Sequence, residues 1–407
     1  MISAVFLARS LGAEGRGELS FFILVFQMVS EYAPIGILHS VAFVINKSGL
    51  EEEKIIGADF FFLSCLSVLV CVLMVGGRLL GFFLNQFSIG MVILGVIICI
   101  LGFFSKLSHG ILTAKNKIRE INFVFLVSNI GMHVVVISMG LMGVLNILHY
   151  LLLLFSSRLI QVALSWKKTP WKPQVEINLG ILKKQLYFGF FVFLGGLFGS
   201  LFYRIDQLMI KEFKGFSELG VYVVAVGLAE KVFLIPDSIS APLIGSLFSS
   251  KDESGAKALV EKTVKIVLFS TATFFFLGFF FRLILPEIFG EEFSEMVYVL
   301  PWLLFGTIGA SVGKVSYPYF LFIGEPKIHT WVTGIALFLN LLCNFLLIPA
   351  FGIIGAAIAT AISYSVYGGV YLALLIKFEH KARRMVLLSK KDLFWVLGLL
   401  KKRNWGK

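Results

Sequence analysis

Four ionisable residues interrupt two strongly apolar segments near the middle of the chain. Arg204 and Asp206 lie at the end of one segment, and Glu230 and Lys231 lie within the next. A charged side chain inside a membrane span costs roughly 3 kcal/mol or more, so it usually faces a cavity or a partner. These residues therefore mark a candidate functional pathway through a membrane.

Lys231 is the central candidate for binding an anionic substrate. It lies near the middle of an apolar segment that begins at about Leu219, and Gly227 stands one turn before it on the same helix face. Glu230 is its neighbour in sequence but points about 100° away around the helix, so the two need not pair. The alternative interpretation is a buried ion pair, for example with Glu31, or a snorkelling side chain.

Other cations extend this candidate substrate site. Arg204 is predicted near the outer end of its span, where snorkelling is also easy, and Lys314 either adds to a cavity or pairs across a helix interface. Arg9 and Arg16 either form an outer gate or a phosphate contact, or they are ordinary loop arginines. Three residues near the inner ends of spans either receive a diphosphate or snorkel to the interface: Lys106, His109 and Arg158.

Intramembrane carboxylates are candidates for coupling transport to H⁺ or Na⁺. They are Asp206, Glu230 and Glu31, although a structural pair or a hydrogen-bonded helix end gives the same pattern. No cofactor is expected. The 4 cysteines lie inside apolar runs without disulfide or metal-ligand spacing. Because the sequence carries no P-loop, HExxH, GxSxG or Asp-rich metal motif, neither a catalytic residue nor a metal site is predicted.

The elements that must position these residues are membrane-spanning helices. The 407 residues are 58% hydrophobic and only 15% charged, with a mean hydropathy of +0.92, which lies far outside the range of soluble domains. Apolar runs of roughly 20 residues match the hydrocarbon thickness as helices. They do not alternate polar and apolar residues as barrel strands do. The composition therefore predicts an all-α polytopic membrane protein.

The pattern of spans divides the chain into two six-helix lobes. The N-terminal lobe, residues 1–165, begins with Met1–Ala8, which we interpret as the remnant of a truncated first helix, followed by a helix-breaking polar turn from Arg9 to Gly17. Its remaining spans are Glu18–Ile45, kinked at Pro34 and Gly36, and four centred near Ser67, Ile97, Gly131 and Leu154. A linker covers 166–185, and the C-terminal lobe, residues 186–376, has spans at about 186–206, 219–248, 264–286, 296–323, 330–349 and 353–376.

Loop charge predicts the orientation. Lysine and arginine gather in the loops on the side of the linker and in the basic tail, residues 377–407, whereas one opposite loop is acidic. The positive-inside rule therefore places the linker and the C-terminus in the cytoplasm. The net charge of +12 is spread over these loops rather than along one stripe, so a nucleic-acid partner is not expected. The tail also carries apolar residues that suit an amphipathic segment on the membrane surface.

A weak internal repeat relates the two halves. The segment Leu11–Ile35, LGAEGRGELSFFILVFQMVSEYAPI, aligns with Phe213–Asp237, FKGFSELGVYVVAVGLAEKVFLIPD, so that Gly12 falls on Gly215. Two halves with equal numbers of spans insert in the same orientation, which predicts a parallel pseudo-twofold repeat. Transporters with such repeats bind substrate near the midplane at the repeat interface.

Three segments resemble the polysaccharide flippase family, the O-antigen and oligosaccharide translocases of the multidrug/oligosaccharidyl-lipid/polysaccharide exporter superfamily. They are ARSLGAEGRGELSFF, YRIDQLMIKEFKGFSELGVYVVAVGLAEK and NLLCNFLLIPAFGIIGAAIATAISY. The resemblance covers essentially the whole chain, except that family members begin with a complete first helix. It implies a flippase that moves an undecaprenyl-diphosphate-linked oligosaccharide from the inner to the outer leaflet of the cytoplasmic membrane by alternating access.

The resemblance also implies the partners: the lipid bilayer, the lipid-linked oligosaccharide and a polysaccharide polymerase complex. A cation-coupled multidrug exporter of the same superfamily is the alternative function, but it favours an acidic cavity, whereas Lys231, Lys314 and Arg204 are basic. A membrane polysaccharide polymerase or ligase is a third hypothesis. Such enzymes are expected to carry a long outer loop, and here the longest polar loop is the predicted cytoplasmic linker.

Overall fold

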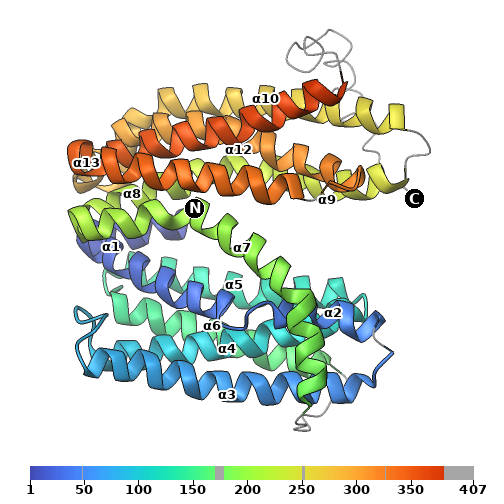
Figure 1. The fold of residues 1–407 in the computed structure, drawn as a ribbon. Coiled ribbons are helices and arrows are strands. Elements are labelled where there is room, and N and C mark those ends of the chain that lie inside the picture. Colours follow the sequence, from blue (N-terminus) through green and yellow to red (C-terminus); the bar gives the residue numbers. More distant parts are fainter. Residues whose placement is uncertain (48, 170–177, 250–252, 326, 380–407) are drawn as a thin grey trace, which may run out of the picture. The chain divides into compact units, whose positions relative to one another are not determined.

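The computed structural model describes residues 1–47, 49–169, 178–249, 253–325 and 327–379, and every element in these residues is a helix (Figure 1). Nine of the helices in these ranges are long and apolar enough to cross a membrane, or ten if one bent pair is a single span. The all-α polytopic fold predicted from composition is therefore confirmed.

The chain divides into two compact units, Met1–Leu197 (unit 1) and Phe198–Lys407 (unit 2). In unit 1, α4 is the central helix, because α1, α2, α3 and α6 all pack against it. In unit 2, α12 has the same role for α8, α9, α10 and α13. The helices of unit 1 are α1 (Ile2–Tyr32), α2 (Ile37–Lys47), α3 (Glu52–Leu79), α4 (Ile89–Ala114), α5 (Ile118–Leu141), α6 (Ile147–Lys168) and the first part of α7 (Leu179–Lys214).

Unit 2 contains the rest of α7 and the helices that follow it. They are α8 (Phe216–Ala229), the 3₁₀ segment η1 (Glu230–Phe233), α9 (Leu234–Ser249), α10 (Glu253–Phe281), η2 (Arg282–Ile284), α11 (Leu285–Phe289), η3 (Glu291–Phe293), α12 (Met296–Phe322) and α13 (Lys327–Glu379). The predicted linker, 166–185, was too long, because α6 continues to Lys168 and α7 already begins at Leu179. Its residues 170–177, and residues 380–407 of the predicted tail, lie outside the described residues. The pseudo-twofold repeat stays a prediction.

Glycine and proline break the longest helices where the sequence indicates. Gly12 in α1 has φ 67°, and Gly352 in α13 has φ 58°, a region that side chains with a Cβ rarely adopt. The kink predicted at Pro34 and Gly36 is a complete break, because α1 ends at Tyr32 and α2 begins at Ile37. The expectation of a polar turn over Arg9–Gly17 was wrong in extent, since only Gly12 leaves the helical conformation and the flanking residues continue the helix.

Helix α7 also differs from the prediction. Its two parts, Leu179–Tyr187 and Val192–Lys214, are bent by 53° relative to each other. The predicted span ended at residue 206, but the helix continues to Lys214. Arg204 and Asp206 therefore lie within a helix rather than at its outer end. They are tolerated there because residues on neighbouring helices hold them, as described below.

Candidate functional site

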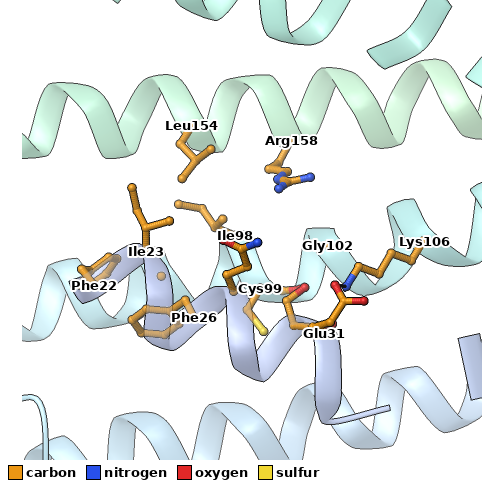
Figure 2. A pocket seen from close by; sticks show the side chains of 13 residues that line it. Phe22, Ile23, Phe26, Glu31, Ile98, Cys99, Gly102, Lys106, Leu154 and Arg158 are labelled. Atoms are coloured by element: carbon orange, nitrogen blue, oxygen red, sulfur yellow. Dashed lines mark hydrogen bonds and ion pairs between the residues drawn. The ribbon is translucent and has the colours of Figure 1, made fainter. Parts of the chain in front are cut away.

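A cavity of about 130 Å³ opens within unit 1 between α1, α4 and α6. Figure 2 shows Arg158 pointing from α6 toward the side of the cavity where Glu31 and Lys106 lie, while Leu154 points from the same helix toward Ile23 and Ile98. The polar lining comes from Glu31, Lys106 and Arg158, with Gln27 and Ser30 beside them. Such a mixture of apolar walls and a few convergent polar groups is typical of a small-molecule site.

Glu31 lies in the last turn of α1, directly before the break at Pro34. Its Oε2 accepts a hydrogen bond from Nζ of Lys106 at 2.5 Å, and the same ammonium donates to the Ser30 carbonyl at 3.0 Å. Oε1 of Glu31 faces Nε2 of His39 at 3.7 Å. The break therefore places one carboxylate between a lysine of α4 and a histidine of α2.

Arg158 carries the excess positive charge of this cavity. Its Nη1 donates to the neutral amide oxygen of Gln161 at 2.8 Å, one turn along α6. Within the described residues, the cavity lining thus holds two cations and one carboxylate. The formal charge of this lining is +1, and no carboxylate of the described residues bonds the guanidinium directly, so the arrangement favours an anion.

The apolar wall lies beside the charges because two glycines let α1 approach α4. A Cβ on Gly95 would lie 2.6 Å from the Phe26 ring, and a Cβ on Gly102 would lie 2.4 Å from Oγ of Ser30. Small residues allow close helix contact in membranes. The remaining wall consists of Phe22, Ile23, Ile98 and Leu154. The cavity therefore places cations beside an apolar wall.

Unit 2 pairs its buried and half-buried charges more completely. Arg204 makes a bidentate contact with Glu230, with Nη1–Oε1 at 2.6 Å and Nη2–Oε2 at 3.1 Å. Nζ of Lys314 bonds Oδ1 of Asp237 at 2.8 Å and lies 4.4 Å from the centroid of the Phe233 ring, a cation–π distance. Both cations thus have a carboxylate partner.

Asp206 is the most enclosed of the predicted coupling residues, with only 4% of its surface exposed. The Tyr222 hydroxyl donates to its Oδ2, the Thr360 hydroxyl lies 3.3 Å from the same oxygen, and the Gln207 backbone N–H donates to Oδ1. The pocket beside it has a volume of about 10 Å³, roughly the space of one water molecule. Asp206 therefore joins α7, α8 and α13 in the interior of unit 2.

The remaining predicted site residues are dispersed. Lys231 lies in η1, in the middle of the span Phe216–Ser249, with an exposed side chain and, within the described residues, no hydrogen-bond or ion-pair partner. Arg9 is exposed on α1 before Gly12. Arg16 lies beyond Gly12, half-buried, with Nη1 donating to the Ser20 hydroxyl at 2.9 Å. The two arginines belong to a helix rather than to the expected loop.

The structure brings together three charged residues that the sequence left apart. The sequence predicts Lys106 and Arg158 as inner-end residues that receive a diphosphate or snorkel, and Glu31 as a coupling residue or a partner of Lys231. All three line one cavity, and Glu31 pairs with Lys106 rather than Lys231. The signal that indicated them was a charge within an apolar run. Their common location depends on which helices pack against α4, and periodicity does not specify that. In the described residues, no cluster of three or more His, Cys, Asp or Glu side chains suits a metal ion.

Comparison with known proteins identifies the family of this chain. The family model described as "Polysaccharide biosynthesis protein" matches residues 6–298. The chain belongs to this polysaccharide biosynthesis protein family. A relative from Haloferax volcanii, named "Probable low-salt glycan biosynthesis flippase Agl15", is 24% identical over 376 residues, which cover 90% of this chain and 77% of the relative.

Solved structures show the fold of this polysaccharide biosynthesis protein. An inward closed conformation of the lipid II flippase MurJ matches with a TM-score of 0.73 at 16% identity, covering 100% of this chain and 90% of that one. An inward-facing multidrug resistance MATE family transporter of the MOP superfamily matches with a TM-score of 0.71 at 14% identity, covering 95% of both chains. The fold is therefore the one that these two solved structures share.

Proposed function

We propose that this protein is a flippase for surface polysaccharide synthesis. It moves an undecaprenyl-diphosphate-linked oligosaccharide from the inner to the outer leaflet of the cytoplasmic membrane by alternating access, with its C-terminus in the cytoplasm. The family match and the name of the Haloferax relative support glycan transport. Both named structural neighbours, MurJ and MATE, are also a flippase and a transporter rather than enzymes.

The observation that carries this proposal is the amphipathic cavity of unit 1. A lipid-linked oligosaccharide has a negative diphosphate between an apolar tail and a polar glycan. Arg158 and Lys106 supply cations for the diphosphate, and Phe22 and Phe26 supply an apolar wall beside them. A guanidinium binds phosphate oxygens through paired hydrogen bonds, and its charge is retained at all accessible pH values.

A cationic drug is a poorer fit to the same cavity. It would meet two cations against the single carboxylate of Glu31, which Lys106 already occupies. Like charges in a partly dry cavity repel more strongly than in water. The fold alone does not distinguish a lipid-linked oligosaccharide from a cationic drug as the substrate. Both substrates therefore have to be assayed.

Purified protein in vesicles tests the proposal. We expect the wild-type protein to translocate a fluorescent undecaprenyl-diphosphate-linked oligosaccharide, measured by its accessibility to a reagent outside the vesicles. Protein-free vesicles and vesicles with heat-inactivated protein give the background. Translocation of a cationic dye without translocation of the lipid-linked glycan would instead identify the protein as a drug exporter and overturn the proposal.

A further inference from the structure

Arg16 of α1 is a partly buried cation that no carboxylate among the described residues balances. Its Nη1 donates to the Ser20 hydroxyl at 2.9 Å, and that hydroxyl donates to the Arg16 carbonyl at 2.7 Å. Glu14 and Glu18 stand two residues away on either side, a spacing that turns them to other faces of the helix. The guanidinium therefore lacks a counter-charge within the described part of unit 1.

One edge of this guanidinium is left without a protein partner. Nε is buried and forms no hydrogen bond within the described residues. Nε–H and one N–H of Nη2 form an edge that can donate two parallel hydrogen bonds to a single anion, whereas Ser20 engages Nη1. A buried charged donor without a partner is costly, and an unbalanced charge inside a membrane span indicates a functional site. The free edge therefore suits a phosphate group.

Tyr150 of α6 supplies a second hydrogen-bond donor beside Arg16. The phenol and the guanidinium lie close enough to interact electrostatically, and the Tyr150 side chain is half-buried in the first turn of α6. A Cβ on Gly15 would lie 3.9 Å from Cδ1 of Ile147, so α1 packs against the first turn of α6 at this level. Both helices thus contribute a donor to the same place.

The same two helices carry Arg158 further along. Arg16 interacts with Tyr150, and Glu31, later in α1, interacts with Arg158, later in α6, so the two helices run in the same direction. Tyr150 precedes Arg158 in α6 by roughly 12 Å along the helix axis. Leu154 lies between them and lines the apolar wall of the cavity (Figure 2). An apolar wall therefore separates two cationic levels.

We propose that Arg16 and Tyr150 form a second anion site, which receives the diphosphate after it leaves Arg158. The C-terminal end of α6 leads into the predicted cytoplasmic linker, so Arg158 lies nearer the cytoplasm and Arg16 nearer the outer face. Because Nε of Arg16 is enclosed, a neighbouring side chain moves when the diphosphate arrives. The inference rests on the proposed function, since it names a second position for the same substrate.

A ligand site and a structural ion pair respond differently when the arginine is removed. Arg16→Gln removes a charge that no described carboxylate balances, so the unfolding temperature should stay at or above that of the wild type. Arg204→Gln is the matched stability control, because it leaves the half-buried Glu230 without its bidentate partner. This control should lower the unfolding temperature by several degrees.

Translocation by the full chain in vesicles tests the second anion site. The substrate is an undecaprenyl-diphosphate-linked oligosaccharide of neutral sugars, so that the diphosphate is its only anion. We expect Arg16→Gln to slow translocation about tenfold, and Tyr150→Phe about threefold because it removes a neutral donor. Tyr187→Phe is the control for the second variant, since the Tyr187 side chain is 80% exposed, and it should translocate at the wild-type rate.

The possible results separate the second anion site from the proposed function. Wild-type translocation by Arg16→Gln overturns the second anion site alone. An unfolding temperature lowered as far as that of Arg204→Gln also overturns it, because Arg16 would then be a structural residue. Equal rates for Tyr150→Phe and Tyr187→Phe remove Tyr150 from the site. Absence of translocation by the wild-type protein overturns the proposed function and the second anion site with it.

Discussion

The charged clusters of the two units differ in how their cations are satisfied. In unit 2, Arg204 and Lys314 each bond a carboxylate, and the neighbouring pocket has room for about one water molecule. In unit 1, Arg158 bonds only a neutral amide among the described residues and faces a cavity of about 130 Å³. The sequence thus shows intramembrane cations in both units. Whether such a cation is available to a ligand depends on the side chains that pack around it.

The largest effect is expected at the break that presents Glu31 to the cavity of unit 1. Gly36 has φ +80°, and a Cβ there would lie 2.1 Å from the Gly189 carbonyl oxygen of α7. Gly36→Ala should therefore destabilise the protein by about 3 kcal/mol or more, from backbone strain and overpacking together. Thermal unfolding in detergent measures this. Gly131→Ala is the control, since a Cβ at Gly131 meets nothing within 4 Å; equal stability of the two variants would contradict the packing described.

The buried contacts of unit 2 should prove structural. Tyr222→Phe removes the hydroxyl that donates to Asp206 in a fully enclosed site. Leaving a buried polar group with one partner fewer costs about 1–3 kcal/mol. We expect a lower unfolding temperature with translocation per folded molecule close to wild type. A stable Tyr222→Phe protein that no longer transports would assign this cluster to the transport cycle instead.

Two predicted substrate contacts of unit 2 test the other side of the comparison. Arg204 and Lys231 remain proposed substrate contacts, and Lys231 is the more accessible of the two because Arg204 is engaged by Glu230. We expect the double variant Arg204→Ala, Lys231→Ala to slow translocation of the lipid-linked glycan by about tenfold, the loss expected when a charge-assisted hydrogen bond is removed. Normal translocation by a folded double variant would remove both residues from the substrate site.

The smallest effect is expected for an ion pair outside the cavity. Lys54 pairs with Glu51 at 2.9 Å, three residues apart, and both side chains are largely exposed. Exposed pairs contribute about 0–1 kcal/mol. Lys54→Ala should therefore leave the unfolding temperature close to that of the wild type. It should change the translocation rate by no more than about twofold. A large loss of transport would show that the translocation rate responds to any lost lysine in unit 1.

Hydropathy and helix-breaking residues were enough to predict most of the fold. The positions of the helices follow from apolar length, and the breaks at Gly12, Pro34 and Gly352 follow from backbone chemistry. The end of α7 was missed because polar residues were interpreted as the end of a span. Arg204 and Asp206 are instead stabilised within the helix by Glu230 and Tyr222 on the elements that follow.

The candidate site was less predictable for a related reason. Lys106 and Arg158 look like interfacial cations when each helix is considered alone. Their meeting with Glu31 needs the contacts of α1 and α6 with α4, together with the close approach that Gly95 and Gly102 allow. Helix packing of this kind involves residues far apart in sequence. It leaves no periodic pattern, so the sequence indicated the individual charges but not the cavity they share.

The translocation rate of Arg158 variants in vesicles tests the central claim most directly. If the diphosphate binds this guanidinium, Arg158→Ala should translocate the lipid-linked oligosaccharide about tenfold to a hundredfold more slowly than the wild type, the range expected for charge-assisted hydrogen bonds. Arg158→Lys should retain part of the rate, because it keeps the charge but not the paired geometry. Wild-type translocation by a folded Arg158→Ala protein would contradict the account.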